Sequence, residues 1–171
     1  MLIVSDTTPI LSLLKAGRLE LLQMLFGVVA IPRAVYDELT RHPAYRDEAD
    51  VVAQSDFLEV CELADRRVAA ELLKRERLDE GESEAIALAE ERHADVLLMD
   101  ERRGRRAAEK RGIRITGTIG VLLYAYDEGL LSGESVMECV ACLREHNIRM
   151  GKSLYMAVQN HLRQTTNDSK M

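Results

Sequence analysis

The sequence has no tryptophan, only three prolines and three cysteines, and no apolar run near the ~18 residues that a transmembrane helix requires. The lack of such a run argues against a membrane protein. Residues 1–6 carry no basic side chain and are too short for a secretory signal peptide. An odd number of cysteines fits a reducing compartment better than a disulfide framework. We therefore expect a cytoplasmic protein with no membrane partner.

Basic residues are outnumbered by acidic ones over the whole chain but are concentrated in one stretch. There are 23 lysines and arginines against 29 aspartates and glutamates, and the net charge of −6 argues against a generally basic, phosphate-coating surface. Between residues 102 and 114, however, seven basic side chains stand against one acid. The sequence therefore predicts a local basic patch. Its members are Arg102, Arg103, Arg105, Arg106, Lys110, Arg111 and Arg114.

The pattern of short apolar runs predicts the fold class. With 171 residues, of which 47% are apolar, the chain suits a single domain with one sizeable core. Largely apolar runs of four or five residues occur at 2–5, 28–31, 57–60, 95–99 and 113–116, and helical patterns separate them. Short strands that alternate with helices are typical of an α/β fold, in which a parallel sheet has helices on both faces.

The ends of the chain carry two further predictions. Thr8 followed by Pro9 predicts a helix that begins after a threonine N-cap. We expect one domain over residues 1–163, in which the last two helices, at about 134–163, form a C-terminal extension. The polar residues 164–171 are predicted to be a disordered tail.

Two carboxylates directly follow predicted strands. Asp6 follows the first strand and Asp100 follows the fourth. In an open parallel sheet, ligands bind at the carboxyl ends of the strands, so a shared functional site is one interpretation. The other is that each aspartate caps the helix that follows it. Capping explains Asp6 less well because Thr8 is already available for that role, whereas for Asp100 it stays open.

A third carboxylate lies on the apolar face of a predicted helix. In the segment PRAVYDELTRH, Val35, Glu38 and Leu39 share one side by their helical spacing. Glu38 is therefore expected to point inward, and Asp37 is expected to face away.

A fourth carboxylate begins the helix GESEAIALAEE. Its inward face contains Ala85 and Ile86, and Glu82 lies one turn before them on the same face. Glu84 lies off that face and is the alternative candidate. A different explanation for Glu82 is that an acid in the first turn favours the helix dipole.

Together these acids and the basic patch indicate one chemistry. Carboxylates that converge in a cleft repel each other strongly unless protons or cations neutralise them. Oxygen ligands in this number select Mg²⁺ or Mn²⁺, and such an ion beside basic side chains suits phosphodiester hydrolysis. The arginines would hold a nucleic-acid backbone; the alternative is that they form a solvated helix face. The residues concerned are Asp6, Glu38, Glu82 and Asp100, with Arg102, Arg103, Arg105 and Arg106 for the nucleic acid.

These stretches resemble a known family. The segments SDTTPILSLLKAGRLELL, VAIPRAVYDEL, LDEGESEAIALAEE, VLLMDERRGRRAAEKRGI and TGTIGVLLYAYDEGLL match, in order and spacing, the PIN-domain proteins. This family of metal-dependent ribonucleases includes VapC-type toxins, and the closest resemblance is to a little-characterised PIN-like nucleic-acid-binding subgroup. The resemblance covers about residues 2–131.

The resemblance implies a three-layer α/β/α PIN fold with a short-stranded parallel sheet and an acidic metal site at the strand ends. It implies Mg²⁺ or Mn²⁺ as cofactor, RNA as substrate, an antitoxin protein as partner, and a homodimer. By position, the implied catalytic and metal-binding residues are Asp6, Glu38, Glu82 and Asp100. The implied supporting residues are Thr7, Glu84 and Thr118, and the two threonine hydroxyls would bind metal-bound water, although capping or turn roles suit them equally well.

The sequence departs from the family pattern at two places. Glu82 stands where nuclease members more often have an aspartate, and Glu101 followed by arginines stands where another aspartate often comes soon after the fourth acid. These departures bear on metal affinity and rate rather than on the fold.

The leading functional hypothesis is a Mg²⁺- or Mn²⁺-dependent endoribonuclease that is the toxin of a toxin–antitoxin pair. A non-catalytic PIN-like module that binds RNA or a protein is the alternative, and metal binding discriminates between the two. A phosphoryl-transfer protein of another doubly wound class fits less well, because no second acid stands two residues after Asp6.

Overall fold

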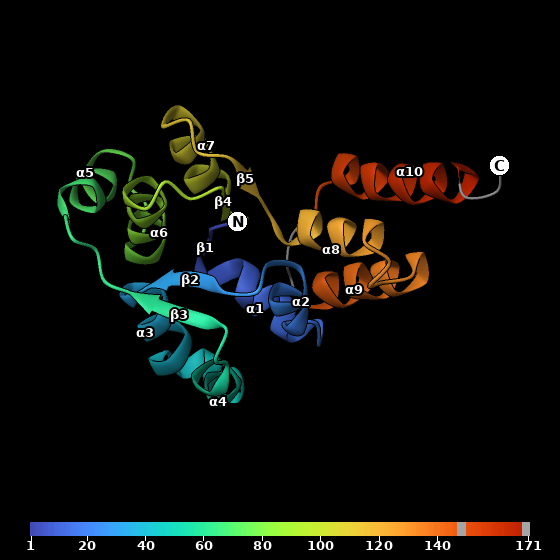
Figure 1. Ribbon diagram of the computed structural model, residues 1–171, viewed down its shortest axis with the longest axis horizontal. Helices are drawn as coiled ribbons and strands as arrows, with labels where there is room; N and C mark the ends of the chain where they lie inside the picture. The colour runs from blue at the N-terminus through green and yellow to red at the C-terminus, as the bar shows by residue number, and fades with distance from the viewer. Residues whose placement is uncertain (147–149, 169–171) are drawn as a thin grey trace.

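A five-stranded sheet lies at the centre of the computed structural model, which describes residues 1–146 and 150–168, with side chains up to residue 164 (Figure 1). All strand pairs are parallel and the strand order is β3-β2-β1-β4-β5, which confirms the predicted α/β class. The order puts β1 at the centre, where Ser5 pairs with Leu98. The strands are β1 (Ile3–Ser5), β2 (Val29–Pro32), β3 (Leu58–Cys61), β4 (Val96–Leu98) and β5 (Ile115–Thr116).

Helices connect the strands and cover both faces of the sheet. None of the helices in the described ranges is long and apolar enough to cross a membrane. They are α1 (Thr7–Lys15), α2 (Glu20–Phe26), α3 (Arg33–Arg41), α4 (Arg46–Gln54), α5 (Arg67–Arg75), α6 (Glu80–Glu91), α7 (Arg102–Lys110), α8 (Thr118–Asp127), α9 (Gly133–Glu145) and α10 (Lys152–Asp168), with a short 3₁₀ helix at Pro43–Tyr45.

Two hydrophobic clusters lie on opposite faces of the sheet. Successive strand residues point to opposite faces, so Ile3 belongs to one cluster and Val4 to the other, and Leu98 and Leu97 divide in the same way. The first cluster joins the sheet to α1, α2, α3, α8 and α9, and the second joins it to α5, α6 and α7. In Figure 1, α5 and α6 lie at one end of the molecule and α8–α10 at the other. The result is the three-layer arrangement that the sequence predicted.

The start of α1 differs from the prediction. The helix begins at Thr7, which puts Asp6 at the N-cap position and makes Thr8 the second helical residue. Pro9 is then the third residue, where it is tolerated because the N–H groups of a first turn have no acceptor within the helix. Thr8 is therefore not the N-cap.

The C-terminal part also differs in one respect. Helix α10 continues to Asp168, so residues 164–168 are helical where a disordered tail was predicted, and residues 169–171 lie outside the described residues. A helix anchored by packing can extend past its last packed side chain, because each added residue gains a backbone hydrogen bond. Val140 of α9 and Val158 of α10 both belong to the same cluster as Ile3, so the two last helices pack on the main core.

Candidate functional site

Asp6 is a buried carboxyl group directly after the central strand. Its side chain is 2% exposed, and its backbone N–H donates to the carbonyl of Leu98 over 3.0 Å. Within the described part of the chain, the Asp6 side chain makes no capping hydrogen bond to α1, so capping does not explain it. Burial raises the pKa of Asp6 from 3.8 to about 8; the backbone N–H of Thr7 partly opposes this, and the nearby acids Asp79, Glu82 and Glu38 add to it.

Glu38 is held beside Asp6 by Thr7. The hydroxyl of Thr7 donates to Glu38 Oε2 over 2.6 Å. A Cβ atom placed on Gly81, in the first turn of α6, would lie 3.4 Å from Glu38 Oε2, 3.4 Å from Thr7 Oγ1 and 3.5 Å from Asp6 Oδ1. The structure thus brings together two of the predicted acids and one predicted supporting residue, at the point where α6 begins.

Asp37 does not face away as predicted. It lines the same cavity of about 450 Å³ as Glu38, and its Oδ2 accepts from Arg41 Nη1 over 3.2 Å. The cavity lies between the first turns of α3 and α6, which pack against each other. Asp37 is next to the inward face of α3 and therefore still borders this cavity.

Glu82 belongs to a capping box at the start of α6. Its backbone N–H donates to Asp79 Oδ1 over 2.7 Å, and its own Oε2 accepts from the backbone N–H of Asp79 over 3.0 Å. Burial raises the pKa of Glu82, and Asp79 and Glu101 add to this, while the Asp79 N–H and Arg103 oppose it. Glu82 therefore lies in the first turn and has a capping role there, and its charge still acts on Asp6.

Asp79 is a member of the acidic group that the sequence interpretation missed. It raises the pKa of both Asp6 and Glu82 and lines the cavity beside Glu38. The spacing Asp79-x-x-Glu82 at the start of a helix is the signature of a capping box and could have revealed it.

Asp100 is held by a single residue of another helix. Thr118 donates its backbone N–H to Asp100 Oδ1 over 2.8 Å and its hydroxyl to Asp100 Oδ2 over 2.5 Å. Asp100 therefore caps α8 rather than α7, the helix that follows it in sequence. A Cβ atom on Gly117 would lie 2.4 Å from Asp100 Oδ1, so a larger residue here would have to displace this carboxylate.

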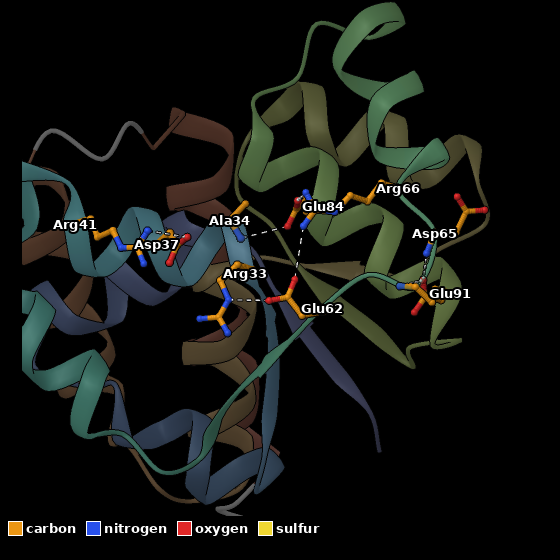
Figure 2. Close-up of polar contacts among 10 residues, drawn as sticks. Arg33, Ala34, Asp37, Arg41, Glu62, Asp65, Arg66, Glu84 and Glu91 are labelled. Carbon is orange, nitrogen blue, oxygen red and sulfur yellow. Dashed lines mark hydrogen bonds and ion pairs between the residues drawn. The ribbon is translucent and has the colours of Figure 1, made fainter.

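Glu84 lies against the start of α3 (Figure 2). It is 4% exposed; its Oε2 accepts from the backbone N–H of Ala34 over 3.2 Å, and its Oε1 lies 3.5 Å from Arg66 Nη1. Figure 2 shows Glu84 between the start of α3 and Arg66. Glu84 also lines the cavity that Glu38 lines.

The four predicted ligands do not all come together in one metal site in this structure. Among the residues that the structure describes, no group of three or more His, Cys, Asp or Glu side chains is placed to hold a metal ion. Asp6, Glu38 and Glu82 surround the start of α6, while both oxygens of Asp100 bind Thr118. The donors available are carboxylate and hydroxyl oxygens, which suit Mg²⁺ or Mn²⁺ by their chemistry. The ligand set stays a prediction.

The arginines of α7 divide into two kinds. Arg102, Arg103 and Arg106 are exposed, and among the described side chains none of them forms an ion pair within 4.0 Å. Arg105 is half-buried and donates from Nη1 to the carbonyl of Met99 over 2.8 Å. Cations in a first turn oppose the helix dipole, so helix stability does not explain the exposed Arg102 and Arg103. Arg111, beyond the end of α7, is paired with Glu90.

Comparison with known families agrees with this architecture. A family model described as a PIN domain (DUF3368) matches residues 2–164, which confirms the resemblance seen in the sequence and extends it through α9 into α10. Searches among curated proteins and among solved structures gave no match.

Proposed function

Because the chain belongs to the PIN-domain family, whose members are generally nucleases, we propose that it is a Mg²⁺- or Mn²⁺-dependent endoribonuclease. The observation that carries this proposal is the meeting of Asp6 and Glu38 at the first turn of α6. A carboxyl group as buried as Asp6 is costly to ionise without a compensating cation. Three further acids around it increase that cost, and a bound divalent ion would relieve it.

The four predicted acids would bind the metal ion from different elements of the fold. Asp6 and Glu38 would bind it, with Glu82 and Asp100 completing the set from α6 and from the end of β4. When bound, Mg²⁺ or Mn²⁺ supplies Lewis acidity, which activates water and stabilises charge on the leaving oxygen. Thr7 orients the Glu38 carboxylate, and Thr118 orients Asp100. Outer hydrogen bonds of this kind set the direction of metal-binding side chains.

The exposed arginines supply the electrostatic part of RNA binding. Arg102, Arg103 and Arg106 follow Asp100 closely in the sequence, and among the described residues none of them forms an ion pair within 4.0 Å, although Arg103 is near enough to Glu82 to oppose the rise in its pKa. Phosphate contacts by such side chains position a nucleic-acid backbone without reading its sequence. Arg105 is not assigned to this role, because its guanidinium already binds the Met99 carbonyl.

Family membership also supports the finer parts of the proposal. We propose a toxin of a toxin–antitoxin pair, an antitoxin protein as its partner and a homodimer as its assembly, each on the strength of the resemblance to VapC-type proteins.

The test is cleavage of labelled single-stranded RNA by the purified, partner-free protein in Mn²⁺ and in EDTA. Wild type is expected to cut only with the metal. Asp6→Asn is expected to lose cleavage by orders of magnitude while it still binds RNA. Absence of cleavage over a broad panel of RNAs, with Asp6→Asn changing neither metal binding nor toxicity in cells, would refute the nuclease proposal.

A non-catalytic RNA- or protein-binding module is the second candidate. The capping roles of Glu82 and Asp100 favour it, because both side chains are occupied by backbone contacts. Titration calorimetry with Mn²⁺ separates the two functions. A protein that binds RNA but shows no heat of Mn²⁺ binding would be the module.

A further inference from the structure

The start of α3 has no cap of its own. The N-cap residue of this helix is Pro32, whose side chain carries no hydrogen-bond acceptor. The first N–H groups of a helix have no partner within the helix, and a side chain, water or ligand has to accept from them. An acceptor for the first N–H groups of α3 therefore has to come from a residue other than Pro32, or from water or a ligand.

Glu84, fifty residues further along, provides that acceptor. Its Oε2 accepts from the backbone N–H of Ala34 over 3.2 Å. Ala34 is the second residue of α3, a position whose N–H a capping side chain ordinarily binds. A negative charge at this point also interacts favourably with the helix dipole.

A chain of ion pairs compensates the buried charge of Glu84. Arg66 Nη1 lies 3.5 Å from Glu84 Oε1, and Arg66 Nη2 lies 3.6 Å from Glu62 Oε2. Glu62 in turn accepts from Arg33 Nε over 2.9 Å, and Arg33 is the first residue of α3 (Figure 2). The network starts and ends on the first turn of α3, so it fixes that turn from two sides.

The same two helices meet again one turn further on. Glu38 follows Ala34 by four residues, and Gly81 precedes Glu84 by three, so each pair shares a helix face. Gly81 is the point where Glu38, Thr7 and Asp6 come together. The contact between Ala34 and Glu84 therefore lies about one helical turn from the point where α3 carries Glu38 next to Asp6.

We infer that Glu84 is a positioning residue: it caps α3 across the helix contact and thereby holds Glu38 in the acidic site, without itself being a metal ligand. The expected effect on metal affinity rests on the proposed function. The capping of α3 and the placement of Glu38 concern the metal-free protein and do not depend on that function.

Helix α6 offers a matched control at its other end. Glu91 Oε2 accepts from the backbone N–H groups of Ala64 and Asp65 over 2.9 and 3.2 Å, which is the same kind of contact. Glu91 is ten residues after Gly81, about 15 Å along the helix axis, and so lies far from the acidic site.

The experiment is a Mn²⁺ titration by calorimetry of wild type, Glu84→Ala, Glu84→Gln and Glu91→Ala. Glu84→Ala is expected to weaken Mn²⁺ binding about 10-fold, the usual effect of losing an outer contact. Glu84→Gln keeps an oxygen acceptor for Ala34 and is expected to bind Mn²⁺ nearly as wild type does. Glu91→Ala is expected to lower the melting temperature but to keep wild-type affinity. A Glu84→Gln variant as weak as Glu84→Ala, or a Glu84→Ala variant as tight as wild type, overturns the inference.

Two measurements in EDTA keep this result separate from the proposed function. Hydrogen exchange of the Ala34 amide is expected to accelerate in Glu84→Ala but not in Glu84→Gln or Glu91→Ala. The carboxyl carbon resonance of Glu38 is expected to shift in Glu84→Ala alone. If wild type binds no Mn²⁺, the metal-dependent function fails, and these two signals decide the positioning role; unchanged signals in Glu84→Ala overturn it.

Discussion

Thr7 and Glu38 are 31 residues apart in the sequence, and the hydroxyl of Thr7 donates to Glu38 Oε2 over 2.6 Å. The bond ties the first residue of α1, directly after β1 and Asp6, to the middle of α3. It sets the direction of a carboxylate that lines the cavity between α3 and α6.

Replacing Thr7 by valine tests the importance of this bond. Valine keeps the shape and removes the donor, so Glu38 loses its orientation and Mn²⁺ affinity is expected to fall about 10-fold in a calorimetric titration. The control is Thr40→Val: Thr40 lies in α3, as Glu38 does, but its hydroxyl donates to the Tyr36 carbonyl. Equal affinities for Thr7→Val and wild type would show that the bond does not serve metal binding.

The raised pKa of Asp6 predicts how the metal-free protein responds to pH. The folded-state pKa of about 8 lies above the ordinary value of 3.8, so the folded protein retains a proton that the unfolded chain releases between these values. The stability from this proton is complete below pH 3.8 and is lost as pH rises through about 8. Asp6→Asn removes the titration. In EDTA, the melting temperature of Asp6→Asn minus that of wild type is expected to increase as pH rises.

The control for that pH series is Asp56→Asn, at an exposed position. It is expected to keep the wild-type slope of melting temperature against pH. A wild-type slope identical to that of Asp6→Asn would mean that Asp6 is ionised at neutral pH in the folded protein.

The two kinds of arginine on α7 predict two phenotypes. Arg102→Ala with Arg106→Ala is expected to weaken RNA binding and to flatten the plot of log affinity against log salt by about 0.7 per lost phosphate contact. Arg105→Ala is expected mainly to lower the melting temperature, since it removes the donor to the Met99 carbonyl. Arg75→Ala, which breaks an exposed pair with Glu71 on α5, is the control. An unchanged salt slope in the double variant would make these arginines a solvated helix face.

Gly117→Ala tests the holding of Asp100. The new Cβ atom would lie 2.4 Å from Asp100 Oδ1, and that carboxylate is held by two bonds from Thr118. Overpacking of this kind costs about 1–3 kcal/mol of unfolding free energy, measured by urea denaturation. Gly133→Ala is the control, because its Cβ atom would meet nothing closer than 3.7 Å. Equal stabilities for the two variants would mean that Asp100 can move aside freely.

Most strands and helices, and the placement of Asp6 and Glu38 within them, could be predicted because they follow from local patterns. Apolar runs and helical spacing identified the five strands of a parallel sheet, and placed Asp6 at a strand end and Glu38 on an inward face. Asp79 could also have been predicted, because its spacing from Glu82 is that of a capping box. These features depend on residues within about one turn of each other.

The hydrogen-bond partners of the carboxylates depend on long-range packing and could not be predicted from local patterns. Asp100 binds Thr118 eighteen residues away, and Glu84 binds the Ala34 backbone fifty residues away. No local pattern identifies such pairs. They form because the first N–H groups of a helix have no acceptor within that helix, and the acceptor can come from a residue far away in the sequence. Whether an acid caps a helix or faces a shared site is set by how α3, α6 and α8 pack around β1, and that packing is a property of the whole chain.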